Sequence, residues 1–70
     1  MTLLEAQSGK AYIITRVDTD DEALNLFLLS LGCCTGEPIT VVSRRKHNCT
    51  ICVKDGRYAM DNRLAAAIEV

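Results

Sequence analysis

Only one stretch of this 70-residue chain has the periodicity of a helix, and it lies between Leu24 and Gly36. Thr19, followed three residues later by Glu22, has the spacing of a capping box, in which a hydroxyl and a carboxylate each satisfy a free backbone N–H. Gly32 is predicted to end the helix, because glycine readily adopts the left-handed conformation that closes a helix. The chain is therefore predicted to be a β-rich domain built around a single main helix.

The residues on different sides of this helix are expected to have different roles. Leu24, Leu28 and Leu31 fall within an arc of about 60° at about 100° per residue, and this stripe is expected to face the core. Leu26 lies roughly opposite the stripe and Phe27 at its shoulder. These two residues are either a contact surface for a partner or scattered exposed apolar residues, which are normal on protein surfaces.

Short segments rich in β-branched residues surround the helix and predict five strands. Residues 61–65 are expected to form a turn or a short 3₁₀ segment. Four of the strands are expected at residues 10–17, 39–44, 49–54 and 67–70. The remaining strand is expected to follow the turn at residues 55–56 directly.

The third of these strands alternates clearly, with Cys49, Ile51 and Val53 on one face. Asp55-Gly56 is a strong hairpin signal and predicts a two-residue type I′ turn that pairs Val53 with Tyr58.

Seventy residues make one domain, residues 1–70, with a marginal core. Five short strands with one helix cannot form a stable flat sheet at this size. Curling into a barrel removes most of the exposed edge. The predicted fold is therefore mostly β with one or two short helices: a small SH3-like barrel with the helix inserted between the first two strands, plugging one end.

The charge and hydropathy of the chain argue against a membrane-spanning or an exported protein. The net charge is −1, from eight basic and nine acidic residues, and no apolar run approaches the roughly 20 residues of a membrane span. The first residues lack the pattern of a signal peptide, so we expect a cytoplasmic location. Disulfides need an oxidising compartment, so the four cysteines are expected to be free thiols or metal ligands.

A composite metal site for zinc or iron is one hypothesis for the thiols, with Cys34, His47, Cys49 and Cys52 as candidate ligands. Cys49 and Cys52 are three residues apart on a strand, so they project to opposite faces and cannot chelate one ion as a simple pair. The alternative is that the thiols are structural, and Cys33 in particular is expected to be buried.

The basic run at Arg45, Lys46 and His47 is expected to be a polar loop between two strands. It is either a solvated hairpin loop or a docking patch for an acidic surface on a partner. A nucleic-acid site is disfavoured because the chain is slightly acidic and has only three aromatic residues on which bases could stack. Catalysis is unsupported, because capping explains the carboxylates and no nucleophile, base and orienting acid are grouped together.

Five motifs along the chain occur together in a known family: the lead-in at residues 3–9, Leu28-x-x-Leu31-Gly32, Thr35-Gly36, Gly56 and Ala65-x-x-Ile68-x-Val70. With these motifs the chain resembles the FeoA-like family, whose members have an SH3-like fold. The resemblance covers nearly the whole chain, although each motif consists mostly of core and turn residues. Thr35 departs from the pattern, since the family usually has proline there, and the cysteines are not part of the family pattern.

The resemblance implies an accessory or regulatory protein of ferrous iron uptake that binds a FeoB-type membrane GTPase transporter. It implies no enzyme activity, no required cofactor, no nucleic acid, and contact with the membrane only through the partner; a homo-oligomer stays open. The alternative is a small thiol protein that binds or senses zinc or iron. The expected partner-binding residues are Leu26, Phe27, Arg45, Lys46 and His47.

Overall fold

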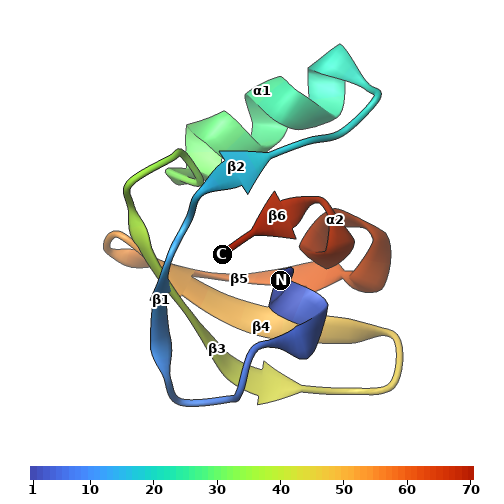
Figure 1. The fold of residues 1–70 in the computed structure, drawn as a ribbon. Helices are drawn as coiled ribbons and strands as arrows, with labels where there is room; N and C mark the ends of the chain where they lie inside the picture. Colours follow the sequence, from blue (N-terminus) through green and yellow to red (C-terminus); the bar gives the residue numbers. More distant parts are fainter.

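The computed structural model describes the whole chain, Met1–Val70, as six strands, two α-helices and one 3₁₀ helix (Figure 1). The strands form two antiparallel sheets, one with the order β1-β3-β4-β5 and one that pairs β2 with β6. In chain order the elements are η1 (Leu3–Glu5), β1 (Ala11–Ile13), β2 (Arg16–Val17), α1 (Glu22–Leu31), β3 (Pro38–Arg44), β4 (Asn48–Val53), β5 (Gly56–Asp61), α2 (Asn62–Ala66) and β6 (Ile68–Glu69).

The predicted fold class is confirmed, since the domain is mostly β with two short helices, but its sheet is not closed into a barrel. The predicted first strand is in fact two strands, and the chain crosses from one sheet to the other between them. Buried Ile14 donates its N–H to the carbonyl of Glu37, whereas Thr15 donates to Glu69 beside the small sheet. Because β1 and β2 belong to different sheets, the core is covered by two separate sheets. The backbone hydrogen bonds therefore do not run in a continuous ring, as they would in a closed barrel.

The core lies between the four-stranded sheet and the segments that fold back over it. Cys49, Ile51 and Val53 are all buried, which confirms the predicted inward face of this strand. Ile39 and Val41 face the same core from β3. In a strand that is covered on one face, every second side chain points into the core. The alternation in the sequence was therefore enough to predict which residues of this strand are buried.

The predicted turn of the β4–β5 hairpin is wrong by one residue, and the predicted pairing of the two strands is wrong by two. The loop residues are Lys54 and Asp55, and Val53 pairs with Gly56 instead of Tyr58. Lys54 has a φ of 51°, whereas Asp55 and Gly56 do not have positive φ, so the turn is not type I′. A Cβ on Gly56 would clash with the hydroxyl of Tyr58, two residues later on the same strand, so this glycine provides the space for the Tyr58 ring.

The predicted capping box at the start of α1 is also wrong. Asp21 is the N-cap, and its carboxylate accepts hydrogen bonds from the N–H groups of Ala23 and Leu24 at 2.8 and 3.3 Å. Thr19 belongs to the preceding turn, where its hydroxyl accepts a hydrogen bond from the N–H of Asp21 at 3.2 Å. At the other end, Gly32 closes the helix with a φ of 99°, as predicted.

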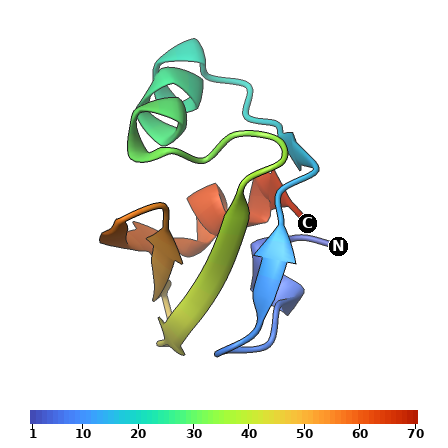
Figure 2. The same ribbon diagram turned by 90° about the vertical axis from the view of Figure 1, so that its left-hand side faces the viewer.

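The predicted core stripe of α1 is confirmed only in part. Leu28 is buried and Leu31 is half-buried against the core, but Leu24 in the first turn is 39% exposed. Figure 2 shows α1 at one end of the molecule, beyond the end of the large sheet. The helix therefore reaches the core through its second half and does not plug a barrel.

The N-terminal segment is held against the sheet by Arg44 at the end of β3. Its guanidinium donates hydrogen bonds to the carbonyls of Leu3 and Ala6 at 2.6 and 3.1 Å. Both of these residues are buried. Arg44 is thus occupied by the fold, which separates it from the basic residues that follow it.

No helix in the structure is long and apolar enough to cross a lipid bilayer.

Candidate functional site

The outer side of α1 carries the two large apolar side chains with the highest exposed fractions in the structure, Leu26 and Leu29. Leu26 is 60% exposed and Phe27 is 49% exposed, so both predicted partner-binding residues are accessible. Leu29 is 56% exposed and was missed by the sequence reasoning. Leu29 follows Leu26 by three residues, which places the two side chains about 60° apart on the helix. This spacing could have predicted that Leu29 lies on the same side of the helix as Leu26. We call Leu26 and Leu29 the outer stripe of α1.

The basic loop between β3 and β4 is exposed in its side chains and held in its backbone. Asn62, the first residue of α2, donates its side-chain N–H to the carbonyl of Lys46 at 3.1 Å and its backbone N–H to the carbonyl of His47 at 3.2 Å. Arg45 donates its N–H to the carbonyl of Asn48 at 2.8 Å, which closes the loop. The three basic side chains thus project from a fixed backbone.

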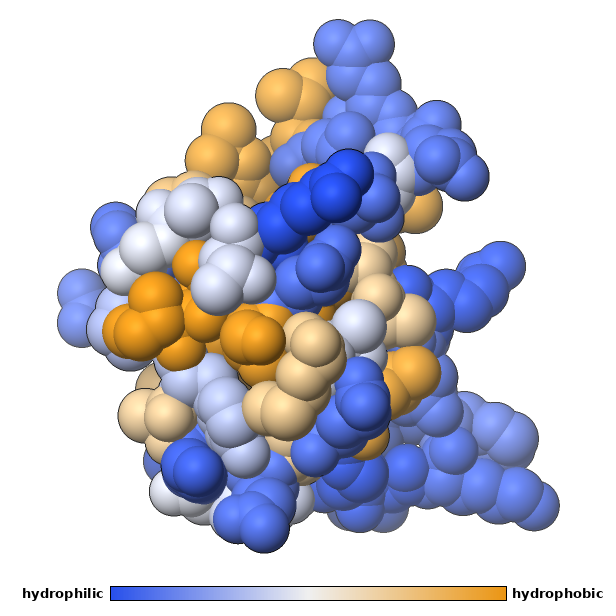
Figure 3. Space-filling view, viewed as in Figure 1, coloured by the Kyte–Doolittle hydropathy of each residue, from blue (hydrophilic) through white to orange (hydrophobic).

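The two predicted contact elements do not form one continuous surface. Both ribbon views place α1 at one end of the molecule and the β3–β4 loop at the opposite end (Figures 1 and 2). The space-filling view shows hydrophobic side chains over α1 at the top (Figure 3). A partner that used both elements would therefore contact two separate areas.

The cysteines divide into two buried and two half-buried thiols. Cys33 and Cys49 are buried, as expected for Cys33, whereas Cys34 and Cys52 are half-buried. Burial raises the pKa of the Cys33 thiol from 9.0 to about 11, and the neighbouring Cys34 adds to the rise. Burial also raises the pKa of Cys49, and the opposing effect of the Arg44 guanidinium is smaller. The two buried thiols are therefore neutral at pH 7.

The structure does not bring the candidate metal ligands together. No group of three or more histidine, cysteine, aspartate or glutamate side chains is arranged so that it could hold a metal ion. Cys49 lies on the inward face of β4 and Cys52 on the outward face, and Cys34 Sγ lies 3.7 Å from the carbonyl of Gly32. Exposed His47 lies in the β3–β4 loop. The composite site of the sequence hypothesis is thus not assembled in this fold.

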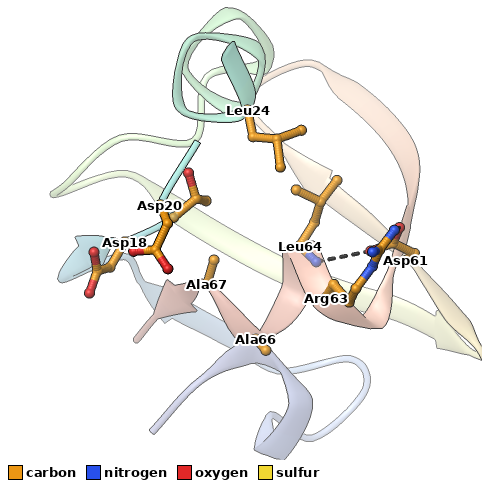
Figure 4. Close-up of a pocket in the computed structure, with 9 residues that line it drawn as sticks. Asp18, Asp20, Leu24, Asp61, Arg63, Leu64, Ala66 and Ala67 are labelled. Atoms are coloured by element: carbon orange, nitrogen blue, oxygen red, sulfur yellow. Dashed lines mark hydrogen bonds and ion pairs between the residues drawn. The ribbon is translucent and has the colours of Figure 1, made fainter. Parts of the chain in front are cut away.

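A groove of about 420 Å³ lies between the start of α1 and α2, and the sequence reasoning did not find it. Leu24 and Leu64 point toward one another across the groove (Figure 4). Four charged side chains surround this apolar pair, and only one of them is positive. The other lining residues are Asp18, Thr19, Asp20, Asp61, Arg63, Ala66 and Ala67.

Comparisons with solved structures place this fold among known domains. The chain is similar to the crystal structure of an iron uptake regulatory protein (FeoA), with a TM-score of 0.86 and 23% identity, covering 97% of this chain and 91% of that one. It is also similar to a manganese-dependent transcriptional repressor, with a TM-score of 0.87 and 17% identity, and it spans only 39% of that longer chain. At these identities the likeness concerns the fold.

Sequence comparison gives the family directly. Curated protein sequences give no significant match. The sequence model of the FeoA domain, in contrast, matches residues 1–70, which is the full length of the chain. This chain therefore belongs to the FeoA domain family.

Proposed function

We propose that this chain is an accessory protein of ferrous iron uptake that binds a FeoB-type GTPase transporter in the cytoplasm and modulates its activity. Membership of the FeoA domain family supports the role in ferrous iron transport. The likeness in fold to an iron uptake regulatory protein is consistent with this role.

The observation that carries the proposal is the exposed apolar side of α1. Leu26, Phe27 and Leu29 are each about half exposed or more in a chain that has few residues with which to build a core. Covering such side chains with a partner yields about 25 cal/mol per Å² of apolar area removed from water. A protein–protein interface needs an apolar centre of this kind.

The basic loop supplies a second, electrostatic contact in this proposal. Arg45, Lys46 and His47 are exposed, and Asn62 holds the loop backbone in place. Charges at the rim of an interface mainly affect the association rate and its salt dependence. Acidic residues on the transporter would be the complement of this loop.

A binding role agrees with the chemistry of the remaining side chains. The FeoA domain family consists of accessory, non-catalytic domains. Asp21 and Asp61 cap the two α-helices, so structural roles account for them. The buried thiols of Cys33 and Cys49 have raised pKa values, which is the opposite of an activated nucleophile.

Titration calorimetry with the full transporter in detergent and with its isolated GTPase portion tests the proposal. We expect saturable binding to at least one of them. Leu26→Gln combined with Leu29→Gln should weaken binding at least about tenfold, because both side chains lose their apolar contact. Reversing charge with Lys46→Glu should weaken binding most at low salt, where the attraction between charges is least screened.

Leu4→Gln is the matched control, because Leu4 is exposed and lies on η1, away from α1. This variant should bind as the unchanged chain does. If neither the full transporter nor its GTPase portion binds the unchanged chain, the proposal is wrong.

A further inference from the structure

We propose that the groove between α1 and α2 binds a short segment of another protein that carries a lysine or arginine next to an apolar side chain. The basic group would approach Asp20, and the apolar group would lie between Leu24 and Leu64. This surface differs from the outer stripe of α1, and the inference does not depend on the transporter being the partner.

The walls of the groove are apolar and open to solvent. Leu24 comes from the first turn of α1 and is 39% exposed, whereas Leu64 comes from α2 and packs against the core on its other side. Their side chains point toward each other across the opening (Figure 4). The volume of about 420 Å³ is at the lower end of the range for ligand pockets, roughly 300–1,000 Å³. The groove is thus suited to a few side chains of a segment.

The charges around the groove favour a cation. Asp18 forms an ion pair with Arg16 at 3.1 Å. Asp61 accepts a hydrogen bond from the N–H of Leu64 at 2.9 Å and forms an ion pair with Arg63 at 3.7 Å. These two carboxylates therefore already have partners within the chain.

Asp20 is different, because no hydrogen bond or ion pair engages its exposed carboxylate. Asp21 and Glu22, which follow it directly in the sequence, are also acidic. The only positive side chain that lines the groove is Arg63, which is 94% exposed and stands on the opposite side from Asp20 (Figure 4). A phosphate or carboxylate ligand would be repelled at the Asp20 side, whereas a lysine or arginine would be attracted.

The combination of acidic rim and apolar walls points to a basic side chain with an aliphatic stem. Lysine and arginine cover apolar surface with their methylene groups while the charged end stays in water. One such residue can contact Leu24 and Asp20 together, and a neighbouring apolar residue can occupy the side of Leu64.

A second copy of this chain is a poorer occupant. All eight of its lysines and arginines are exposed, in the β3–β4 loop and elsewhere. None of these basic residues is adjacent in the sequence to one of the exposed large apolar side chains, so no segment of a second copy presents the required pair. We therefore assign the groove to a segment of a different protein.

The test is an NMR titration of the ¹⁵N-labelled chain with three short synthetic peptides that have blocked ends. The first has the sequence Gly-Lys-Leu-Gly-Leu-Lys-Gly, the second has glutamate in place of both lysines, and the third has glycine in place of both leucines. We expect the first peptide to shift the amide signals of Asp20, Leu24, Leu64 and Ala67, and this effect should decrease with added salt. The other two peptides should cause much smaller shifts.

Two pairs of variants locate the binding. Asp20→Asn should weaken binding of the first peptide about threefold, as expected for an exposed charge pair. Asp55→Asn, which removes the same charge from the exposed β4–β5 turn, should leave it unchanged. Leu24→Gln should weaken it about fivefold or more, whereas Leu29→Gln, on the outer stripe, should not.

The outcomes separate the alternatives. Equal shifts with the lysine and glutamate peptides, shifts confined to other surfaces, or no shifts would each overturn the inference. Shifts of the groove signals that depend on protein concentration without peptide would assign the groove to a second copy and overturn it as well. Because the peptides contain no transporter sequence, failure of transporter binding would leave this result unaffected.

Discussion

The helix α1 and the strand β4 use similar apolar residues for opposite purposes. In β4 every second residue is buried, and Cys49, Ile51 and Val53 are almost completely inaccessible to solvent. In α1 only Leu28 is buried, although seven of the ten residues are large apolar side chains or alanine. Hydrophobicity alone therefore does not tell which residues form the core of this domain.

The difference comes from what each element has around it. Strand β4 lies between β3 and β5 and is covered by the rest of the domain on its inner face. Helix α1 lies at one end of the molecule and contacts the core through Leu28 and Leu31. The apolar side chains of β4 stabilise the fold, whereas the outer stripe of α1, Leu26 and Leu29, remains available for a partner.

The largest expected effect compares two neighbours within α1. Leu28→Ala should lower the free energy of unfolding by about 2 to 5 kcal/mol, because it leaves a cavity at a fully buried site. Leu29→Ala should change it by less than about 0.5 kcal/mol, because Leu29 is exposed. Urea unfolding followed by circular dichroism measures both. Equal losses would mean that the helix is not divided into a core side and a free side.

A smaller effect is expected where the N-terminal segment joins the sheet. Arg44→Met keeps the aliphatic stem but removes the hydrogen bonds to the carbonyls of Leu3 and Ala6. We expect a loss of about 1 to 3 kcal/mol and faster amide hydrogen exchange in residues 1–6. Arg57→Met, on exposed β5, is the control and should change neither quantity. An unchanged exchange rate in Arg44→Met would show that other contacts hold this segment.

The junction between α1 and the sheet can be tested at Gly32. Gly32→Ala should cost about 1 to 2 kcal/mol, because the φ of 99° is strained for alanine and the new Cβ would lie 3.0 Å from Lys54 Cγ. Gly9→Ala has a similar φ of 85° but meets no atom within 4 Å, so it should cost less. Thermal unfolding of both variants gives the difference. If the two costs are equal, the contact with Lys54 contributes nothing and backbone strain explains the whole effect.

The last effect concerns the buried thiol next to this junction and is absent at neutral pH. Because the pKa of Cys33 is raised to about 11 in the folded state, its neutral form stabilises the fold below pH 9. This contribution should be lost as the pH rises from about 9 to about 11, by at most about 1.4 kcal/mol per pH unit. Cys33→Ala should therefore show a shallower decrease in stability over this range in urea titrations. Identical slopes would contradict the burial of this thiol.

Local sequence signals were sufficient where neighbours along the chain decide the structure. The alternation of Cys49, Ile51 and Val53 gave the inner face of β4, and Gly32 gave the end of α1. They were misleading where several local solutions compete. Thr19 and Asp21 both precede the helix and both can cap it, and the Asp55-Gly56 pair suggested a turn that lies one residue earlier.

The candidate sites depended on contacts that no short segment contains. The exposure of Leu26 and Phe27 was expected, whereas that of Leu29, three residues after Leu26, was missed. The groove between Leu24 and Leu64 joins residues 40 positions apart, so no local pattern could indicate it. The opposite faces of Cys49 and Cys52, in contrast, were predicted from the alternation of the strand, and the structure confirms them.

The sequence by itself determined that this is a small, mostly β domain with one main helix that ends at a glycine. Those properties follow from side-chain periodicity and backbone preference, which act over a few residues. Only the tertiary structure decided that the sheet stays open, that α1 buries one residue, and that an acidic, partly apolar groove lies between the helices. These features depend on which segments cover one another, because the removal of apolar surface from water is decided by the whole fold.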